Sequence, residues 1–143
     1  MEAGRFAPSG MNRQPALFIA VQDKETRDTL SRMNAAVMGN SGDPFYGAPT
    51  VVLVLVEASV GTGDEDGALA MGNMLNAAYS LGLGSCWIHR AKEMFESEEG
   101  KALLRKWGVQ GEYRGVGCCI LGYPADGFPA AKPRREGNVL YIR

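Results

Sequence analysis

The stretch DGALAMGNMLNAAYSLGLGSCWI, residues 66–88, decides the fold, because it joins an apolar helix to a short apolar strand. Leucine, methionine and alanine recur through residues 66–81 at helical spacing. Gly82 follows them and is a typical residue for ending a helix. Residues 85–88 then have the length and apolar content of a buried strand. A helix this apolar is expected to be central or packed on both sides.

The same alternation extends along the chain in both directions. Three more apolar runs lack period-two alternation, which predicts strands covered on both faces. These runs are residues 16–21, 51–56 and 117–121. Strands that alternate with helices predict one domain over residues 1–143, of α/β or α+β class, with helices around one sheet.

Two further helices follow from spacing and capping residues. Residues 23–38 place Leu30, Met33 and Val37 on one side, with charged residues elsewhere. Residues 97–107 begin with Ser97, a favourable N-cap residue, and Gly108 lies just beyond their end.

Composition excludes several classes of protein. The net charge is −1 in 143 residues, which gives no reason to expect nucleic acid as a partner. No apolar run approaches the roughly 18–20 residues that span a bilayer, so no membrane partner is expected. Three cysteines without CxxC spacing argue against disulfides and against a zinc site. Cys118 and Cys119 lie in an apolar run, as core thiols do. We expect a cytoplasmic protein without a metal site.

Motif searches find no residues equipped for difficult chemistry. The chain has no complete G-x-G-x-x-G and no P-loop motif, and its acidic loop at 61–67 lacks EF-hand spacing. His89 is the only histidine, so no His-rich metal site can form. The sequence therefore indicates either a cofactor or no chemistry at all.

Two segments read as irregular. Residues 39–49 form a loop rich in Gly, Pro, Asn and Asp, with Phe45 and Tyr46 near its tip. Residues 122–138 contain three prolines and a basic group. The last residues, 138–143, read NVLYIR and predict a short terminal strand.

The turn PSGMNRQP, residues 8–15, carries more hydrogen-bonding groups than a turn requires. Asn12 and Gln14 precede a strand, and amide side chains can bond either to their own backbone or to a ligand. The residues alone leave both interpretations open.

Three stretches together resemble the FMN-dependent nitroreductase family. RFAPSGMNRQP (5–15) is similar to the family's first flavin-contacting turn, and the helix running into LGLGSCWI (81–88) is similar to its core helix and flavin-side strand. GYPAD (122–126), followed by a K-x-R spacing, resembles the family's C-terminal end. The resemblance implies an α+β fold with a central, mostly antiparallel or mixed sheet flanked by helices.

The resemblance also implies the residues that hold FMN. Asn12 and Gln14 would contact the ring edge, the backbone of His89 or Arg90 would direct an N–H at flavin N5, and Lys132 with Arg134 would bind the phosphate. No side chain is expected to be catalytic. The implied FMN-contacting residues are Pro8, Ser9, Met11, Asn12, Gln14, Trp87, Ile88, His89, Arg90, Lys132 and Arg134.

The family's activity and assembly complete what the resemblance implies. An oxidoreductase would pass hydride from NADH or NADPH through FMN to nitroaromatics, quinones or similar small acceptors, with Phe45, Tyr46 and Trp87 as candidate lining of the acceptor pocket. The chain would be a homodimer, with residues 138–143 reaching the partner subunit. The alternative is a protein of this fold that binds or senses a flavin or another planar ligand without turnover.

One family feature has no counterpart in this sequence. Family members have an Arg-x-Ser-x-Arg arm ahead of the Pro-Ser turn, whereas this sequence has only residues 1–7 ahead of Pro8, and they do not contain that motif. Two explanations stay open: the sequence lacks the start of a longer protein, or it is a short member that binds FMN weakly or binds another ligand. Either way, Lys132 and Arg134 are the expected phosphate ligands.

Overall fold

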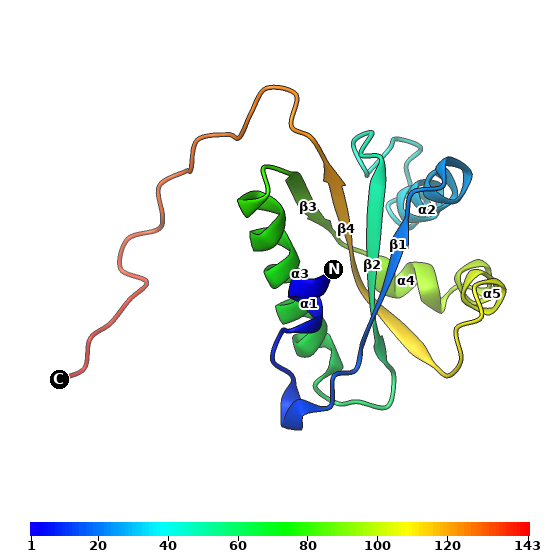
Figure 1. Cartoon of the computed structure of the whole chain (residues 1–143), viewed down its shortest axis with the longest axis horizontal. Coiled ribbons are helices and arrows are strands. Elements are labelled where there is room, and N and C mark those ends of the chain that lie inside the picture. The colour runs from blue at the N-terminus through cyan, green and yellow to red at the C-terminus, as the bar shows by residue number, and fades with distance from the viewer.

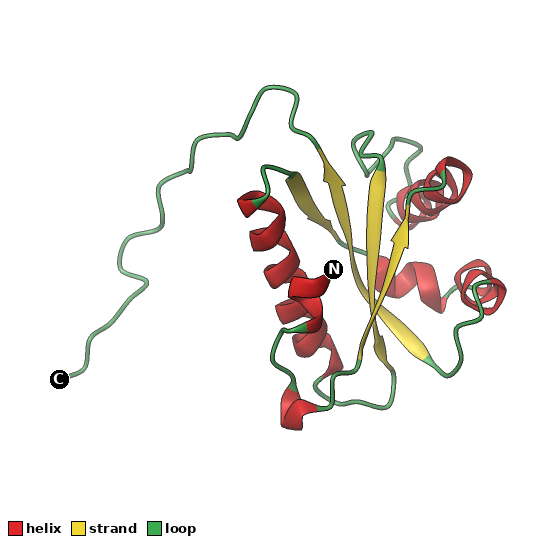
Figure 2. Ribbon diagram, in the orientation of Figure 1, coloured by secondary structure: helices red, strands yellow, loops and turns green.

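A four-stranded antiparallel sheet lies between two layers of helices in the computed structural model, which describes residues 1–143 (Figures 1 and 2). The strands are β1 (Ala16–Val21), β2 (Thr50–Glu57), β3 (Gly84–Ile88) and β4 (Tyr113–Gly122). Their order across the sheet is β1-β2-β4-β3, and each neighbouring pair is antiparallel. The expected α+β class is therefore confirmed.

Each face of the sheet has its own helical layer and its own core (Figure 1). One layer contains α1 (Glu2–Arg5) and α3 (Gly63–Ser80), and the short 3-10 helix η1 (Gly10–Asn12) precedes β1. The other layer contains α2 (Lys24–Val37), α4 (Ala91–Glu96) and α5 (Glu98–Lys106). Alternate residues of β2 point to opposite layers, so Val54 packs under α3 and Leu53 packs under α4.

Local sequence sets the helix ends. The Asp23 carboxylate accepts a hydrogen bond from the Thr26 N–H and caps α2. At the end of α3, Gly82 has φ +74°, and Leu83 N–H returns to the Ala78 carbonyl, which is a Schellman motif. Gly82 therefore has the helix-ending role that the sequence predicts.

Some boundaries differ from the expectation. The helix predicted at 66–81 begins three residues earlier, at Gly63. Gly67 allows α3 to approach the sheet, because a Cβ there would lie 2.6 Å from Val116 Cγ2. The helix predicted at 97–107 is preceded by a separate helix, α4, which the sequence pattern does not predict. Ser97 ends α4 and caps α5, since its hydroxyl donates to Met94 O and accepts from Gly100 N–H.

Burial also departs from the prediction in two places. The strands β1 and β3 are the edges of the sheet, and most of their residues are only half-buried, so the expectation that all four strands are covered on both faces is wrong. In α2, Val37 is exposed, whereas the polar Asn34 is fully buried beside Leu30 and Met33.

Residues 123–143 leave the body of the molecule without helix or strand (Figure 1). The terminal strand expected at 138–143 does not form within the single chain, and its pairing with a partner stays a prediction. None of the helices has both the length and the apolar character required to cross a bilayer.

Candidate functional site

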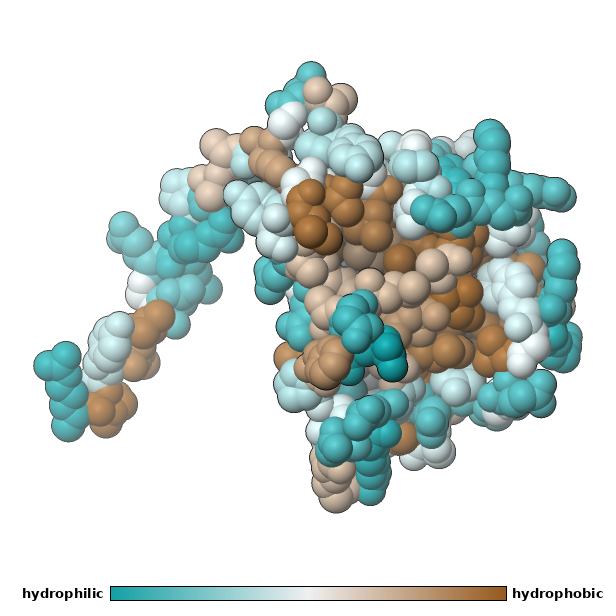
Figure 3. Space-filling view, viewed as in Figure 1, coloured by the Kyte–Doolittle hydropathy of each residue, from teal (hydrophilic) through white to brown (hydrophobic).

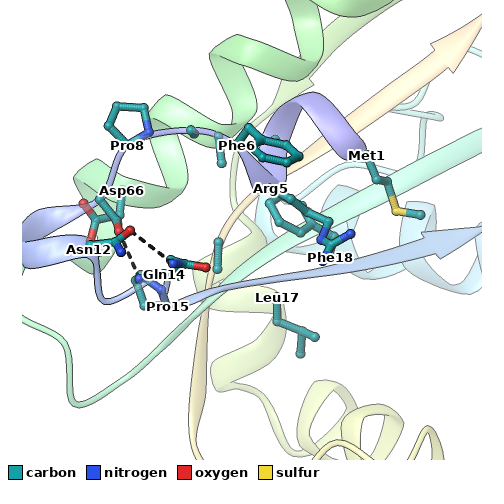
Figure 4. Close-up of a pocket in the computed structure, with 15 residues that line it drawn as sticks. Met1, Arg5, Phe6, Pro8, Asn12, Gln14, Pro15, Leu17, Phe18 and Asp66 are labelled. Atoms are coloured by element: carbon teal, nitrogen blue, oxygen red, sulfur yellow. Dashed lines mark hydrogen bonds between the residues drawn. The ribbon is translucent and has the colours of Figure 1, made fainter.

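A cleft of about 620 Å³ lies between α1, α3, β1 and the turn that leads into β1 (Figure 4). This volume is within the range of small-molecule and cofactor pockets. Of the predicted site residues, Pro8, Ser9, Asn12 and Gln14 line it. Met11 does not, because its side chain is 79% exposed outside the cleft.

The turn that borders this cleft has a strained backbone. Met11, Asn12 and Gln14 have φ of 51°, 54° and 51°, in the left-handed region that non-glycine residues rarely adopt. Each such residue costs on the order of 1 kcal/mol or more, and it persists only where surrounding contacts impose it. Inside the turn, Ser9 Oγ accepts the Gln14 N–H at 2.9 Å.

Asp66 of α3 supplies the contact that fixes the turn from outside. Its side chain is 5% exposed, and Oδ1 accepts the Gly10 N–H at 2.8 Å while Oδ2 accepts the Thr62 hydroxyl at 3.0 Å. Gly10 has to be glycine here, since a Cβ would lie 2.5 Å from Thr62 Oγ1. Asp66 therefore joins the turn to the first turn of α3.

The two amide side chains of the turn keep hydrogen-bonding capacity for a ligand. Gln14 Nε2 donates to Asn12 Oδ1 at 3.1 Å, and no further protein partner bonds Asn12 Nδ2 or Gln14 Oε1 (Figure 4). An amide donor and an amide acceptor thus remain free beside the cleft. This pair suits the edge of a planar heterocycle that presents donors and acceptors side by side.

A second cleft, of about 420 Å³, lies where β3 ends. Trp87, Ile88, His89 and Arg90, which the family resemblance implies as flavin-contacting residues, all line it. Arg90 has φ +76°, a further left-handed residue at a cleft. Opposite these residues stands the 39–49 loop, including Asn40 and Tyr46.

Asp43 holds this loop in place. Its carboxylate accepts hydrogen bonds from Arg27 at 2.6 Å, from Ser31 at 2.6 Å and from the Gly47 N–H at 2.8 Å. Partial burial opposes ionisation, but these hydrogen bonds outweigh it and lower the pKa of Asp43 well below its ordinary value. The loop therefore has a defined shape at neutral pH.

The three aromatic residues proposed to line an acceptor pocket, Phe45, Tyr46 and Trp87, have different environments in the structure. Phe45 is fully buried in the core under the Arg27 guanidinium and lines neither of these two clefts, so the structure does not place it in an acceptor pocket. Tyr46 is 78% exposed at the rim of the second cleft. Trp87 lines the second cleft, but its ring also packs on Gly117, where a Cβ would lie 2.4 Å from Nε1.

The two adjacent thiols are core groups. Cys118 and Cys119 are buried, as the sequence predicts. Burial raises the pKa of Cys118 to about 12 and that of Cys119 to about 11, so neither is a thiolate at neutral pH.

The structure places the predicted site residues in three separate locations. The first cleft lies beside β1 and the second beside β3, and these strands are opposite edges of the sheet. Three inter-strand spacings, about 14 Å, separate the two edges. Lys132 and Arg134 are exposed on the segment that leaves the body, in neither cleft.

Comparison with known proteins gives this arrangement a context. A sequence model of the nitroreductase family matches residues 34–123. An Archaeoglobus fulgidus protein named "Putative NADH dehydrogenase/NAD(P)H nitroreductase" is 33% identical over 88% of this chain and 71% of its own length. The chain belongs to the nitroreductase family.

Solved structures of nitroreductases share the fold of this nitroreductase-family chain. A Bacteroides fragilis nitroreductase with bound FMN superposes with a TM-score of 0.88 at 31% identity, covering 99% of this chain and 83% of that one. A Desulfitobacterium hafniense nitroreductase with bound FMN has a TM-score of 0.85 at 25% identity, with coverage of 99% and 83%.

Two residues that support the clefts do not stand out in the sequence of this nitroreductase-family chain. Asp66 reads only as the start of a helix, and Asn34 carries no motif. Asn34 is four residues after Leu30, so it falls on the apolar side of α2. A polar residue within an apolar stripe is a signal that can be read from sequence, but its partner cannot.

Proposed function

We propose that this chain is an NAD(P)H-dependent FMN oxidoreductase that reduces nitroaromatic, quinone or similar small acceptors. The observation that carries the proposal is the strained turn at Ser9–Gln14, whose free amide groups border a cofactor-sized cleft in a family with FMN-bound members. When bound, FMN supplies the redox chemistry, accepting hydride at N5 and passing the electrons on. The protein's part is to bind, orient and shield it.

The residues present fit this cofactor at both clefts. Asn12 Nδ2 and Gln14 Oε1 would meet the ring edge, where a flavin presents acceptors and a donor. At the second cleft, the backbone after β3 would face N5 with an N–H of His89 or Arg90. Neither role needs a titrating side chain.

A homodimer would bring the two separated clefts together, one from each protomer. One chain holds them at opposite edges of its sheet, so we propose that the turn of one protomer meets the β3 end of its partner across a two-fold axis. Apolar side chains occupy a broad area of the face that contains α1 and α3 (Figure 3), and large exposed apolar surfaces mark interaction sites. On and directly beside α1 and α3, the exposed large apolar residues are Met1, Phe6, Leu69, Tyr79 and Leu81.

The C-terminal segment supplies the remaining parts of the proposal. Residues 138–143 would pair with the partner subunit, which explains an exposed run containing Leu140 and Ile142. Lys132 and Arg134 would then reach the FMN phosphate and form charge-assisted hydrogen bonds with it. A cytoplasmic location stays a prediction, consistent with three free cysteines.

The colour and mass of the purified protein test the proposal. We expect a yellow protein of twice the 15.3 kDa chain mass, which releases FMN on denaturation and is bleached by NADH or NADPH. A colourless protein that gains no flavin spectrum with added FMN would overturn it. FMN binding without bleaching by either nucleotide would favour a binding or sensing role instead.

Phosphate recognition has a sharper test. Lys132→Ala combined with Arg134→Ala should weaken FMN binding by about tenfold or more while leaving riboflavin nearly unchanged, because riboflavin has no phosphate. Arg135→Ala removes a neighbouring charge and is the matched control, with little expected effect. Equal losses for FMN and riboflavin would refute the phosphate role.

A further inference from the structure

Asn34 is a fully buried polar residue that hydrogen-bonds the two residues directly after β3, His89 and Arg90. It lies on α2 with an exposed fraction of 0%. Its Nδ2 donates to the His89 carbonyl at 2.7 Å and contacts Met94 Sδ at 3.2 Å, and its Oδ1 accepts Arg90 Nε at 3.2 Å. A buried side-chain amide whose nitrogen and oxygen are both hydrogen-bonded is held in one orientation.

These contacts determine which way the His89–Arg90 peptide faces. The chain has no cis peptide bonds, and in a trans peptide the C=O and the N–H point in opposite directions. The His89 carbonyl points inward at Asn34. The Arg90 N–H therefore points away from Asn34, and it donates to no acceptor within the chain.

The backbone at this corner is strained. Arg90 has φ +76°, a conformation that glycine adopts freely and other residues adopt at a cost. Asn34 bonds the groups on either side of the Arg90 N–H: its Nδ2 donates to the His89 carbonyl, and its Oδ1 accepts from the Arg90 side chain. These bonds supply the compensation that a strained functional backbone requires.

We infer that Asn34 is a positioning residue that directs the Arg90 N–H, and not that of His89, towards N5 of the flavin. The inference rests on the proposed FMN function and deepens it by naming the donor and the side chain that aims it. Without Asn34, the His89–Arg90 peptide can turn, and the N–H no longer has a fixed direction.

A comparison of FMN with 5-deaza-FMN tests this directly, because the analogue has a carbon in place of N5 and cannot accept the bond. Dissociation constants are measured by titration with the full-length protein. In the unmodified protein, FMN should bind about fivefold more tightly than 5-deaza-FMN, the worth of one ordinary hydrogen bond. In Asn34→Leu the ratio should fall to about one, with FMN affinity reduced and 5-deaza-FMN affinity nearly unchanged.

Two controls separate positioning from general destabilisation. Leu30→Ala empties a fully buried position on the same helix and should lower the unfolding midpoint while keeping the fivefold ratio. Asn34→Asp keeps an acceptor for Arg90 but sets a carboxylate against the His89 carbonyl, so it should lose the ratio as Asn34→Leu does, and it serves if Asn34→Leu does not fold.

The outcomes distinguish the inference from the function beneath it. If neither flavin binds the unmodified protein, the proposed function fails. If FMN binds but the unmodified protein shows no preference over 5-deaza-FMN, or if the Asn34 variants keep that preference, the positioning role is refuted. In the unmodified protein the Arg90 amide proton should also shift further downfield in NMR spectra with FMN than with 5-deaza-FMN, because only FMN accepts its hydrogen bond at N5.

Discussion

Replacing Asp66 with alanine should loosen the Ser9–Gln14 turn and destabilise the whole protein. Asp66 is buried and accepts hydrogen bonds from the Gly10 N–H and the Thr62 hydroxyl. A hydrogen bond to a charged acceptor is worth about 1.5–3 kcal/mol, and an acidic residue in the first helical turn adds about 0.3–1 kcal/mol. We therefore expect the free energy of unfolding to fall by about 2–4 kcal/mol.

Urea unfolding followed by circular dichroism measures this loss. With a slope of about 2 kcal/mol per molar, a loss of about 3 kcal/mol lowers the midpoint by about 1.5 M. FMN affinity should fall with it, because the released turn no longer presents Asn12 and Gln14 together.

Two substitutions calibrate the result. Asp66→Asn keeps an oxygen that accepts the Gly10 N–H, and its amide N–H can donate to the Thr62 hydroxyl oxygen. The free energy of unfolding should therefore fall by no more than about 1 kcal/mol. Asp64→Ala removes an exposed carboxylate of the same helical turn, paired with Arg114 on the surface, and should also cost less than about 1 kcal/mol. If Asp66→Ala is no more harmful than Asp64→Ala, the turn does not depend on Asp66.

Two other predictions concern packing and pH. Gly67→Ala should destabilise by about 1–3 kcal/mol despite its better helix propensity, because the added methyl would meet Val116 at 2.6 Å, whereas Gly72→Ala, with open space around it, should stabilise by about 0.5–1 kcal/mol. Urea midpoints for the pair check this, and equal shifts would contradict it. Since the pKa of Asp43 is lowered by folding, its stabilisation is complete above its unfolded pKa of about 3.9 and is lost as pH falls below that. Asp43→Asn should therefore lose less stability than the unmodified protein between about pH 5 and pH 3, and identical losses would exclude Asp43 as a source of acid sensitivity.

Elements defined by neighbouring residues were predictable. The range 16–21 matches β1, and the other three predicted strands lie inside the observed ones. Gly82 ends α3 and Ser97 caps α5 through contacts within five residues, so the signals are local. The start of α3 was not predicted because Gly63 has poor helix propensity, and close packing on Val56 favours glycine there.

Part of the cleft lining could be named from the sequence, but its arrangement could not. Asn12, Gln14 and the 87–90 segment could be named from motifs, and each lines a cleft. Their separation at opposite edges of the sheet follows from strand order, which depends on pairing between distant segments. Phe45 and Tyr46 are adjacent in sequence, yet one is fully buried and the other is 78% exposed.

The sequence by itself determined the alternation of helices and strands, the helix ends and the family, because these depend on residue types at short spacing. Only the tertiary structure decided which groups support the clefts. Asp66 reaches Gly10 across 56 residues, and Asn34 reaches His89 across 55. Such contacts impose left-handed conformations on Met11, Asn12, Gln14 and Arg90 that local preference opposes. A conformation held against its own propensity can be seen only when the residues that hold it are in place.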